Sequence, residues 1–161
     1  MNKKQLKEFL DEKVVQYNRP EFIESDPIQI PHLFTKKEDV EISGFLTATI
    51  AWGNRKSILN NSNKLMQLLN NSPFDFVMNA SEDDLDSLSG FVHRTFNGGD
   101  LQYFIKALQN IYKTRGGLET IFTRNSTNTS TQTAISAFKK EFFSLPHQPR
   151  TQKHVSDPLK N

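Results

Sequence analysis

The chain has 161 residues, no cysteine and a net charge of only +2. This length fits one domain with a single hydrophobic core, and the absence of cysteine excludes disulfides and thiolate metal sites. The charged N-terminus is unlike a signal peptide, and no stretch approaches the ~20 apolar residues that span a bilayer, so we expect a cytoplasmic protein with no membrane partner.

The N-terminal third is predicted to hold two helices. The chain opens with apolar residues at helical spacing, which predict an amphipathic helix: Leu6, Phe9, Leu10, Val14 and Tyr17. Prolines punctuate residues 20–34, which indicates an extended connector. Thr35 and Glu38 match a capping box before a very apolar run that ends near Trp52, and we predict that this helix is the most buried one.

Further helices follow from their start signals. Asn54 is predicted to cap the next helix, Ser72 with Pro73 and then Ser81 open two short ones, and Asn97–Asp100 is a turn and cap before a strong helix. The polar residues 123–133 are predicted to form a mobile loop, and a final helix begins near Ala134.

No segment alternates convincingly between apolar and polar residues, so little sheet is expected. The sequence therefore predicts an all-α fold, a single bundle of about six or seven helices over residues 1–145. Residues 146–161 form a basic tail that contains prolines, which we interpret as a truncated continuation.

Charge is unevenly distributed along the chain. Residues 1–89 hold 10 lysines and arginines against 14 acidic residues, whereas residues 90–161 hold 10 against 4. A basic half is typical of proteins that bind polyanions. The alternative interpretation is that these cations are solvated helix faces and a loose tail.

The first candidate site is the turn that follows the apolar helix. Asn54, Arg55 and Lys56 start the next helix, whose free backbone N–H groups and positive dipole end suit a phosphate. Trp52, just before them, can stack on a base. The alternative is an ordinary corner between two helices, with Trp52 in the core and both cations in water.

The second candidate site is Phe91–Asp100, which combines aromatic residues, a His-Arg pair and two glycines. The glycines allow close approach of backbone to a ligand, Arg94 suits bidentate phosphate binding, and His93 can act as an acid or base. Its alternative is a tight loop whose phenylalanines fill the core.

Two other possibilities carry less weight. The tail segment Arg150–Pro158 can clamp phosphates, with disordered or truncated structure as its alternative.

The four histidines are far apart and show no metal-ligand spacing, and no phosphate-binding glycine loop or nucleophile elbow is present, so we expect no metal or cofactor.

Several of these segments resemble signature stretches of one uncharacterised bacterial protein family, a domain of unknown function. They occur in order along essentially the whole chain: Tyr17–Ile23, Ile50–Ile58, Phe91–Asp100 and Arg150–Asn161. Members of that family are longer, and their second half is similar to helix-hairpin-helix DNA glycosylases. The segment around Trp52–Lys56 is more loosely similar to the part of those enzymes that faces DNA.

The resemblance implies a glycosylase-like repair domain that contacts duplex DNA through Trp52, Asn54, Arg55, Lys56, His93 and Arg94. A complete protein would excise a flipped base. This chain lacks the Pro-x-Asp-x-His-like stretch that holds the catalytic aspartate, and the polar wedge residue has no clear match. We therefore expect no catalysis by this chain alone, which leaves the missing C-terminal half as a possible partner.

The rival interpretation is a non-enzymatic protein-interaction domain. In that case Trp52, Phe91 and Phe96 would be exposed and would contact a protein partner.

Overall fold

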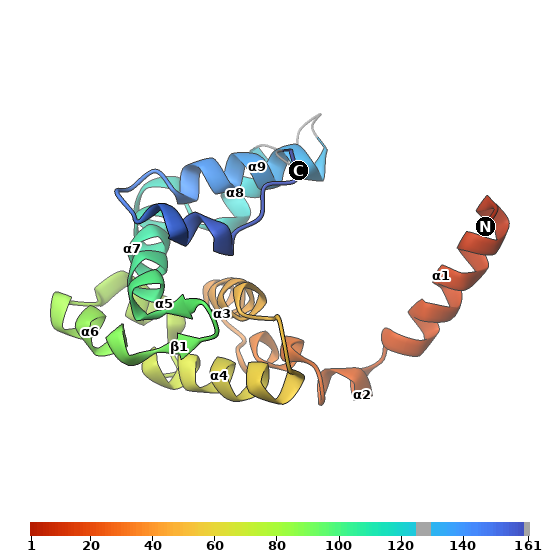
Figure 1. Cartoon of the computed structure of the whole chain (residues 1–161), viewed down its shortest axis with the longest axis horizontal. Coiled ribbons are helices and arrows are strands. Elements are labelled where there is room, and N and C mark those ends of the chain that lie inside the picture. The colour runs from red at the N-terminus through yellow and green to blue at the C-terminus, as the bar shows by residue number, and fades with distance from the viewer. Residues whose placement is uncertain (125–129, 160–161) are drawn as a thin grey trace.

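A computed structural model describes residues 1–124 and 130–159. Nine α-helices, four 3₁₀ helices and one short hairpin make up these residues, so the predicted all-α fold is confirmed (Figure 1). The helix count exceeds the predicted six or seven because the connector and several turns form short helices of their own. None of the helices described is both long and apolar enough to cross a membrane.

The elements run in the following order: α1 (Lys3–Tyr17), α2 (Pro20–Ile23), η1 (Pro27–Gln29), η2 (Pro31–Leu33), α3 (Lys37–Thr49), α4 (Arg55–Leu68), α5 (Pro73–Asn79), α6 (Glu82–Ser87), η3 (Leu88–Gly90), β1 (Val92–His93), β2 (Phe96–Asn97), α7 (Gly98–Arg115), α8 (Leu118–Arg124), α9 (Thr131–Phe142) and η4 (Pro149–His154). β1 pairs antiparallel with β2, and Val92 lies opposite Asn97.

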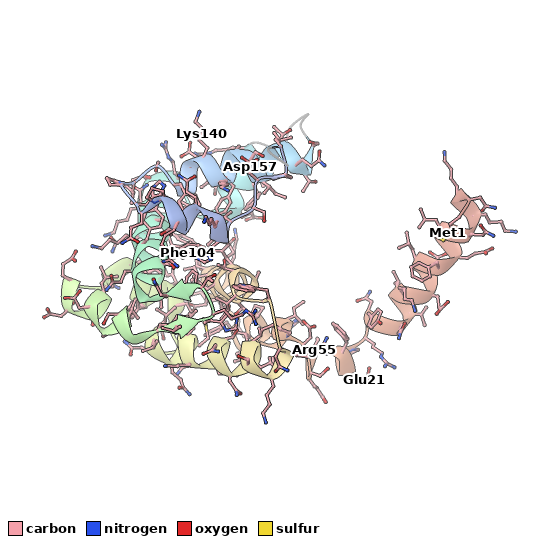
Figure 2. The ribbon with its side chains drawn as sticks, in the orientation of Figure 1. Met1, Glu21, Arg55, Phe104, Lys140 and Asp157 are labelled. Carbon is pink, nitrogen blue, oxygen red and sulfur yellow. The ribbon has the colours of Figure 1, made fainter. Side chains whose placement is uncertain are left out.

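The core is organised around α7 and not around α3, contrary to the prediction. α7 contains buried residues from Gly98 to Ile111, whereas those of α3 lie between Ile42 and Thr47. Phe104 lies in the middle of the body (Figure 2) and contacts the rings of Phe45, Phe96 and Phe142. These contacts join α3, β2, α7 and α9, because aromatic rings bury large apolar areas and favour edge-to-face packing.

Some of the predicted helix starts are confirmed and one is wrong. Asn54 caps α4 by accepting from the Ser57 N–H, and Ser81 caps α6. The capping box at Thr35 is wrong, since α3 begins at Lys37 after Lys36, which makes no side-chain cap. α3 also ends at Thr49, before Trp52, so the segment 50–54 is a turn and not helix.

The structure explains why the second candidate site has a glycine at position 98. A Cβ at this position would lie 2.2 Å from the Ser89 carbonyl oxygen, a distance that real Cβ atoms do not reach. The glycine therefore allows the start of α7 to pack on the backbone of η3, and not on a ligand. Phe91 and Phe96, which precede this glycine in the chain, are fully buried. The rival prediction that these two aromatics are exposed is wrong.

The first helix does form, but it does not pack on the body. α1 contains no buried residue and extends away from the other helices (Figure 1). Its last residue, Tyr17, contacts the ring of Phe22 in α2. The apolar face that predicted an amphipathic helix is thus open along α1.

The other end of the chain packs on the body. Residues 149–154 of the predicted tail form η4, in which Thr151 is buried. Of the predicted loop at 123–133, residues 123–124 are the end of α8 and α9 begins at Thr131, while 125–129 lie outside the described residues.

Candidate functional site

The two candidate segments of the sequence meet in the folded chain. The turn after α3 and the β1–β2 hairpin lie against each other, although Trp52 and Arg94 are 42 positions apart. The Arg94 guanidinium carbon lies 4.6 Å from the centre of the Trp52 ring, a cation–π arrangement. Trp52 keeps 38% of its surface exposed, so the pair forms a surface that is both aromatic and cationic.

The backbone of both turns supports this pair. Gly53 has φ +109°, and a Cβ there would lie 3.0 Å from an Arg94 guanidinium nitrogen. Arg94 itself has φ +55°, in the left-handed region that residues other than glycine rarely adopt. The hairpin turn thus holds Arg94 in an uncommon conformation that directs its side chain over the indole.

His93 lies beneath this surface. Only 2% of it is exposed, so its ring is shielded from a bound macromolecule. Its Nδ1 lies 3.1 Å from the Asn61 amide nitrogen and its Nε2 lies 3.3 Å from the Trp52 carbonyl oxygen. With the amide donating to Nδ1 and Nε2–H donating to Trp52, the ring ties α4 to the turn. His93 had no identifiable partner in the sequence, and the structure supplies two.

A buried carboxylate anchors the C-terminal segment. Asp100, in the first turn of α7, is 1% exposed. It accepts hydrogen bonds at 2.8 Å from both the Arg150 guanidinium and the Thr151 hydroxyl, and one from the Asn97 N–H. Arg150 also donates to the Thr95 carbonyl oxygen. Asp100 is thus shared between capping α7, where an acid is favourable, and holding η4.

His154 completes this cluster without a good hydrogen bond. Its Nε2 is 3.3 Å from an Asp100 oxygen, but this buried atom has no hydrogen-bond partner among the described residues. Burial lowers the pKa of His154 below its ordinary value of 6.5, because water no longer solvates the charged ring. The Asp100 carboxylate opposes this effect and Arg150 adds to it.

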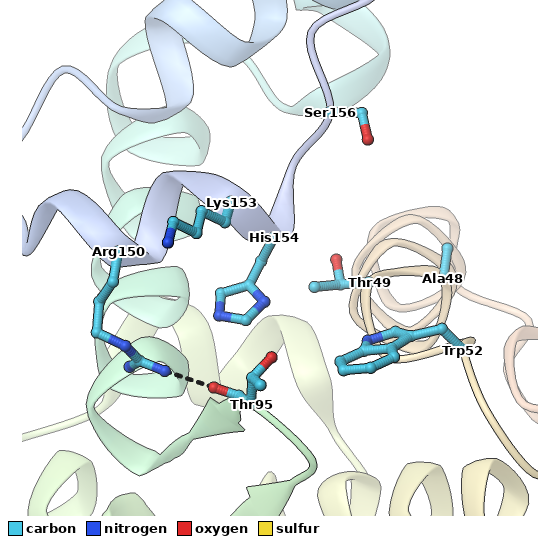
Figure 3. Close-up of a pocket in the computed structure, with 8 residues that line it drawn as sticks. All are labelled: Ala48, Thr49, Trp52, Thr95, Arg150, Lys153, His154 and Ser156. Carbon is cyan, nitrogen blue, oxygen red and sulfur yellow. Dashed lines mark hydrogen bonds between the residues drawn. The ribbon is translucent and has the colours of Figure 1, made fainter.

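These elements enclose a cleft of about 520 Å³, which we call the basic cleft. Its wall consists of residues from α3, the following turn, the hairpin and the η4 region: Ala48, Thr49, Trp52, Thr95, Arg150, Lys153, His154 and Ser156. Figure 3 shows Arg150 and Trp52 on opposite sides of the opening, with His154 pointing in between them. The buried Asp100 is paired with Arg150, and none of the described residues that line the cleft is acidic.

The predicted helix-start cations are placed differently. Arg55 forms an ion pair with Asp26 at 3.7 Å, whereas Lys56 is exposed, and neither lines the basic cleft. Asn54 is engaged as the cap of α4. Of the six predicted contact residues, Trp52 alone lines the cleft. Arg94 and His93 both contact Trp52, Arg94 at its ring and His93 at its carbonyl oxygen.

The cations of η4 were considered in the sequence but not selected. Lys153 is exposed and forms no ion pair with any residue in 1–124 or 130–159. The signal available in the sequence was the basic composition of the tail. The roles of Asp100 and Thr95 had no such signal, since each depends on a contact to Arg150 at least 50 positions away.

The comparisons with known proteins identify a family without a described activity. No curated protein and no solved structure matches the chain. Residues 26–161 match the family described as "Protein of unknown function (DUF2400)". This range contains α3 to η4 and every residue of the basic cleft, and it leaves out α1 and α2. The chain belongs to this family of unknown function.

Proposed function

We propose that this chain binds nucleic acid through the basic cleft and the adjoining Trp52–Arg94 surface. The observation that carries the proposal is that a half-exposed indole, which lies under the Arg94 guanidinium, lines the same opening as Arg150 and Lys153. Cationic side chains recognise the phosphate backbone, and an indole can stack on a base of any sequence.

The cations differ in whether they already form other interactions within the chain. Lys153 is exposed and unpaired within the described residues, so it can contact a phosphate without breaking another interaction. Arg150 is committed to Asp100 and Thr95 and serves mainly to position η4. Arg94 is exposed over Trp52. We therefore assign the phosphate contacts to Lys153 and Arg94, and the base contact to Trp52.

The same surface fits the glycosylase-like resemblance of the sequence. In that interpretation the chain is the DNA-binding portion of a bacterial, cytoplasmic repair protein. Excision of a base needs a catalytic aspartate in a motif that this sequence lacks. The proposed role of this chain is therefore binding, with any excision performed by a longer protein.

The test is fluorescence anisotropy of the chain with a short duplex that contains an abasic site, repeated over a salt series. We expect the affinity to fall with salt, and Lys153→Ala to reduce the slope of log affinity against log salt by about 0.9, the value for one phosphate contact. Lys113→Ala is the matched control, since Lys113 is also exposed but lies on the last turn of α7, away from the cleft.

Two further variants locate the contact. Trp52→Ala should weaken binding by roughly fivefold or more if the indole stacks on a base. Arg55→Ala combined with Lys56→Ala tests the helix-start site that the sequence favoured. Absence of binding at low salt by a folded chain contradicts the proposal. Equal effects of Lys153→Ala and Lys113→Ala contradict the basic cleft as the binding surface.

A further inference from the structure

We infer that the basic cleft takes up a proton together with its phosphate, and that the His154 ring holds this proton. The inference rests on the proposed function, since it describes how pH regulates binding in the same cleft. His154 lines the cleft between Arg150 and Trp52 (Figure 3), and its side chain is 7% exposed. A group that titrates near neutral pH is thus built into the wall of the proposed phosphate site.

The first argument is that one ring nitrogen of His154 has no hydrogen-bond partner. Nε2 is buried without a hydrogen bond to any described residue, which is uncommon for a buried polar atom. An Asp100 oxygen lies 3.3 Å away, but this oxygen already accepts from the Asn97 N–H and the Arg150 guanidinium. The other Asp100 oxygen accepts from the Thr151 hydroxyl. Asp100 is therefore engaged by donors other than His154.

The second argument is the balance of charge around the ring. Asp100 from α7 and Arg150 from η4 are the charged groups that act on His154, and they are paired with each other. Lys153 is the next residue in η4, the contacting ring of Phe96 is uncharged, and so are the α3 and hairpin residues that line the cleft. Burial lowers the pKa of His154 below its ordinary value. The ring is therefore neutral at about pH 7 in the free chain.

A phosphate in the basic cleft changes this balance. Its negative charge favours the charged form of a nearby histidine, so binding raises the affinity of His154 for a proton. The coupling is reciprocal, so a proton on His154 raises the affinity of the cleft for a phosphate by the same factor. Nucleic acid should therefore bind more tightly as the pH falls from the His154 pKa of the bound chain to that of the free chain.

The test is fluorescence anisotropy with the same abasic duplex, at constant ionic strength, between about pH 8 and about pH 5.5. Circular dichroism at each pH checks that the chain is folded. We expect the affinity of the natural chain to rise by about tenfold over this range, as for coupling to one histidine. Binding that is independent of pH overturns the inference and leaves the proposed function standing. No binding at any pH contradicts the proposed function itself.

Two matched substitutions assign the proton to one ring. His154→Gln keeps a polar side chain that does not titrate, so its affinity at about pH 8 should equal that of the natural chain within about twofold. Its increase toward acid should be about threefold or less. His32→Gln should keep the full increase, because His32 is exposed and does not line the cleft. A His154→Gln chain that keeps the full increase, or that loses the same affinity at every pH, overturns the assignment to His154.

A second measurement uses the natural chain without substitution. Calorimetric titration with the duplex, in two buffers of different ionisation enthalpy, counts the protons taken up on binding. We expect an uptake of roughly half a proton at about pH 6.5 and almost none at about pH 8, where His154 stays neutral in both states. Binding without proton uptake at either pH overturns the inference.

Discussion

The two ends of the chain pack in the opposite way from what their compositions suggest. α1 carries a row of apolar side chains, yet none of its residues is buried, and Tyr17 at its end contacts the ring of Phe22. The segment 149–155 is polar and basic, yet it buries Thr151 and Val155 and contacts the start of α7. An apolar face therefore did not predict packing, and a polar segment did not predict a loose tail.

The two segments differ in whether the body offers a group that binds them, and not in their own apolar content. η4 is held because Asp100 presents a buried carboxylate that needs donors, and Arg150 and Thr151 supply them. A buried charge without partners is strongly unfavourable, so this demand fixes the position of η4. Within residues 1–124 and 130–159, no part of the body buries a residue of α1.

The largest effect is expected from removing that carboxylate. Asp100→Ala leaves the Thr151 hydroxyl and part of the Arg150 guanidinium without acceptors and removes a cap of α7. We expect the free energy of unfolding in urea to fall by about 3 kcal/mol. Asp86→Ala, an exposed residue in α6, should cost less than about 0.5 kcal/mol.

Hydrogen exchange sharpens this test. Amides of η4 should exchange much faster in Asp100→Ala, while those in the middle of α7 stay protected. If Asp100→Ala costs no more than Asp86→Ala, the carboxylate does not hold the C-terminal segment, and the contrast between the two ends has another cause.

A smaller effect is expected from pH. Burial lowers the pKa of His154, so the folded chain binds this proton less readily than the unfolded chain does. Stability from the neutral ring is complete above the unfolded pKa of about 6.5, and it is lost as the pH falls from there toward the lower folded pKa. His154→Gln should therefore reduce the drop in the urea midpoint between about pH 7.5 and about pH 5.5.

The control for the pH prediction is His32→Gln, because His32 is exposed. This variant should keep the full pH dependence of the natural chain. A His154→Gln chain whose urea midpoint falls with acid as much as that of the natural chain would show that the ring does not contribute.

Local patterns predicted much of the fold. The all-α class, the caps at Asn54 and Ser81, and the apolar face of α7 all follow from residues within one or two turns of each other. The same kind of reasoning failed at Thr35, where a capping-box pattern is present but the cap position is Lys36, one residue later. Such a pattern states a preference that packing of the connector can override.

The candidate site was predictable only in part for the same reason. Trp52 and Arg94 were each selected on chemical grounds, but their contact joins positions 42 apart, and no local rule predicts it. The link between Asp100 and Arg150 spans 50 positions. Because these non-local contacts form the cleft, the sequence predicted several of the residues around it but not its shape.

The smallest effect is expected on the far side of α1. Val15 is 80% exposed, so Val15→Ala should change the free energy of unfolding of the body by less than about 0.5 kcal/mol. Alanine favours helix more than valine does, so the helicity of α1 should rise slightly in circular dichroism. Leu46→Ala in the buried stripe of α3, where the side chain is 1% exposed, should instead cost about 2–5 kcal/mol. A loss above about 1 kcal/mol in Val15→Ala would mean that α1 packs on the body in solution. The two ends of the chain would then be alike, and the contrast between them would not hold.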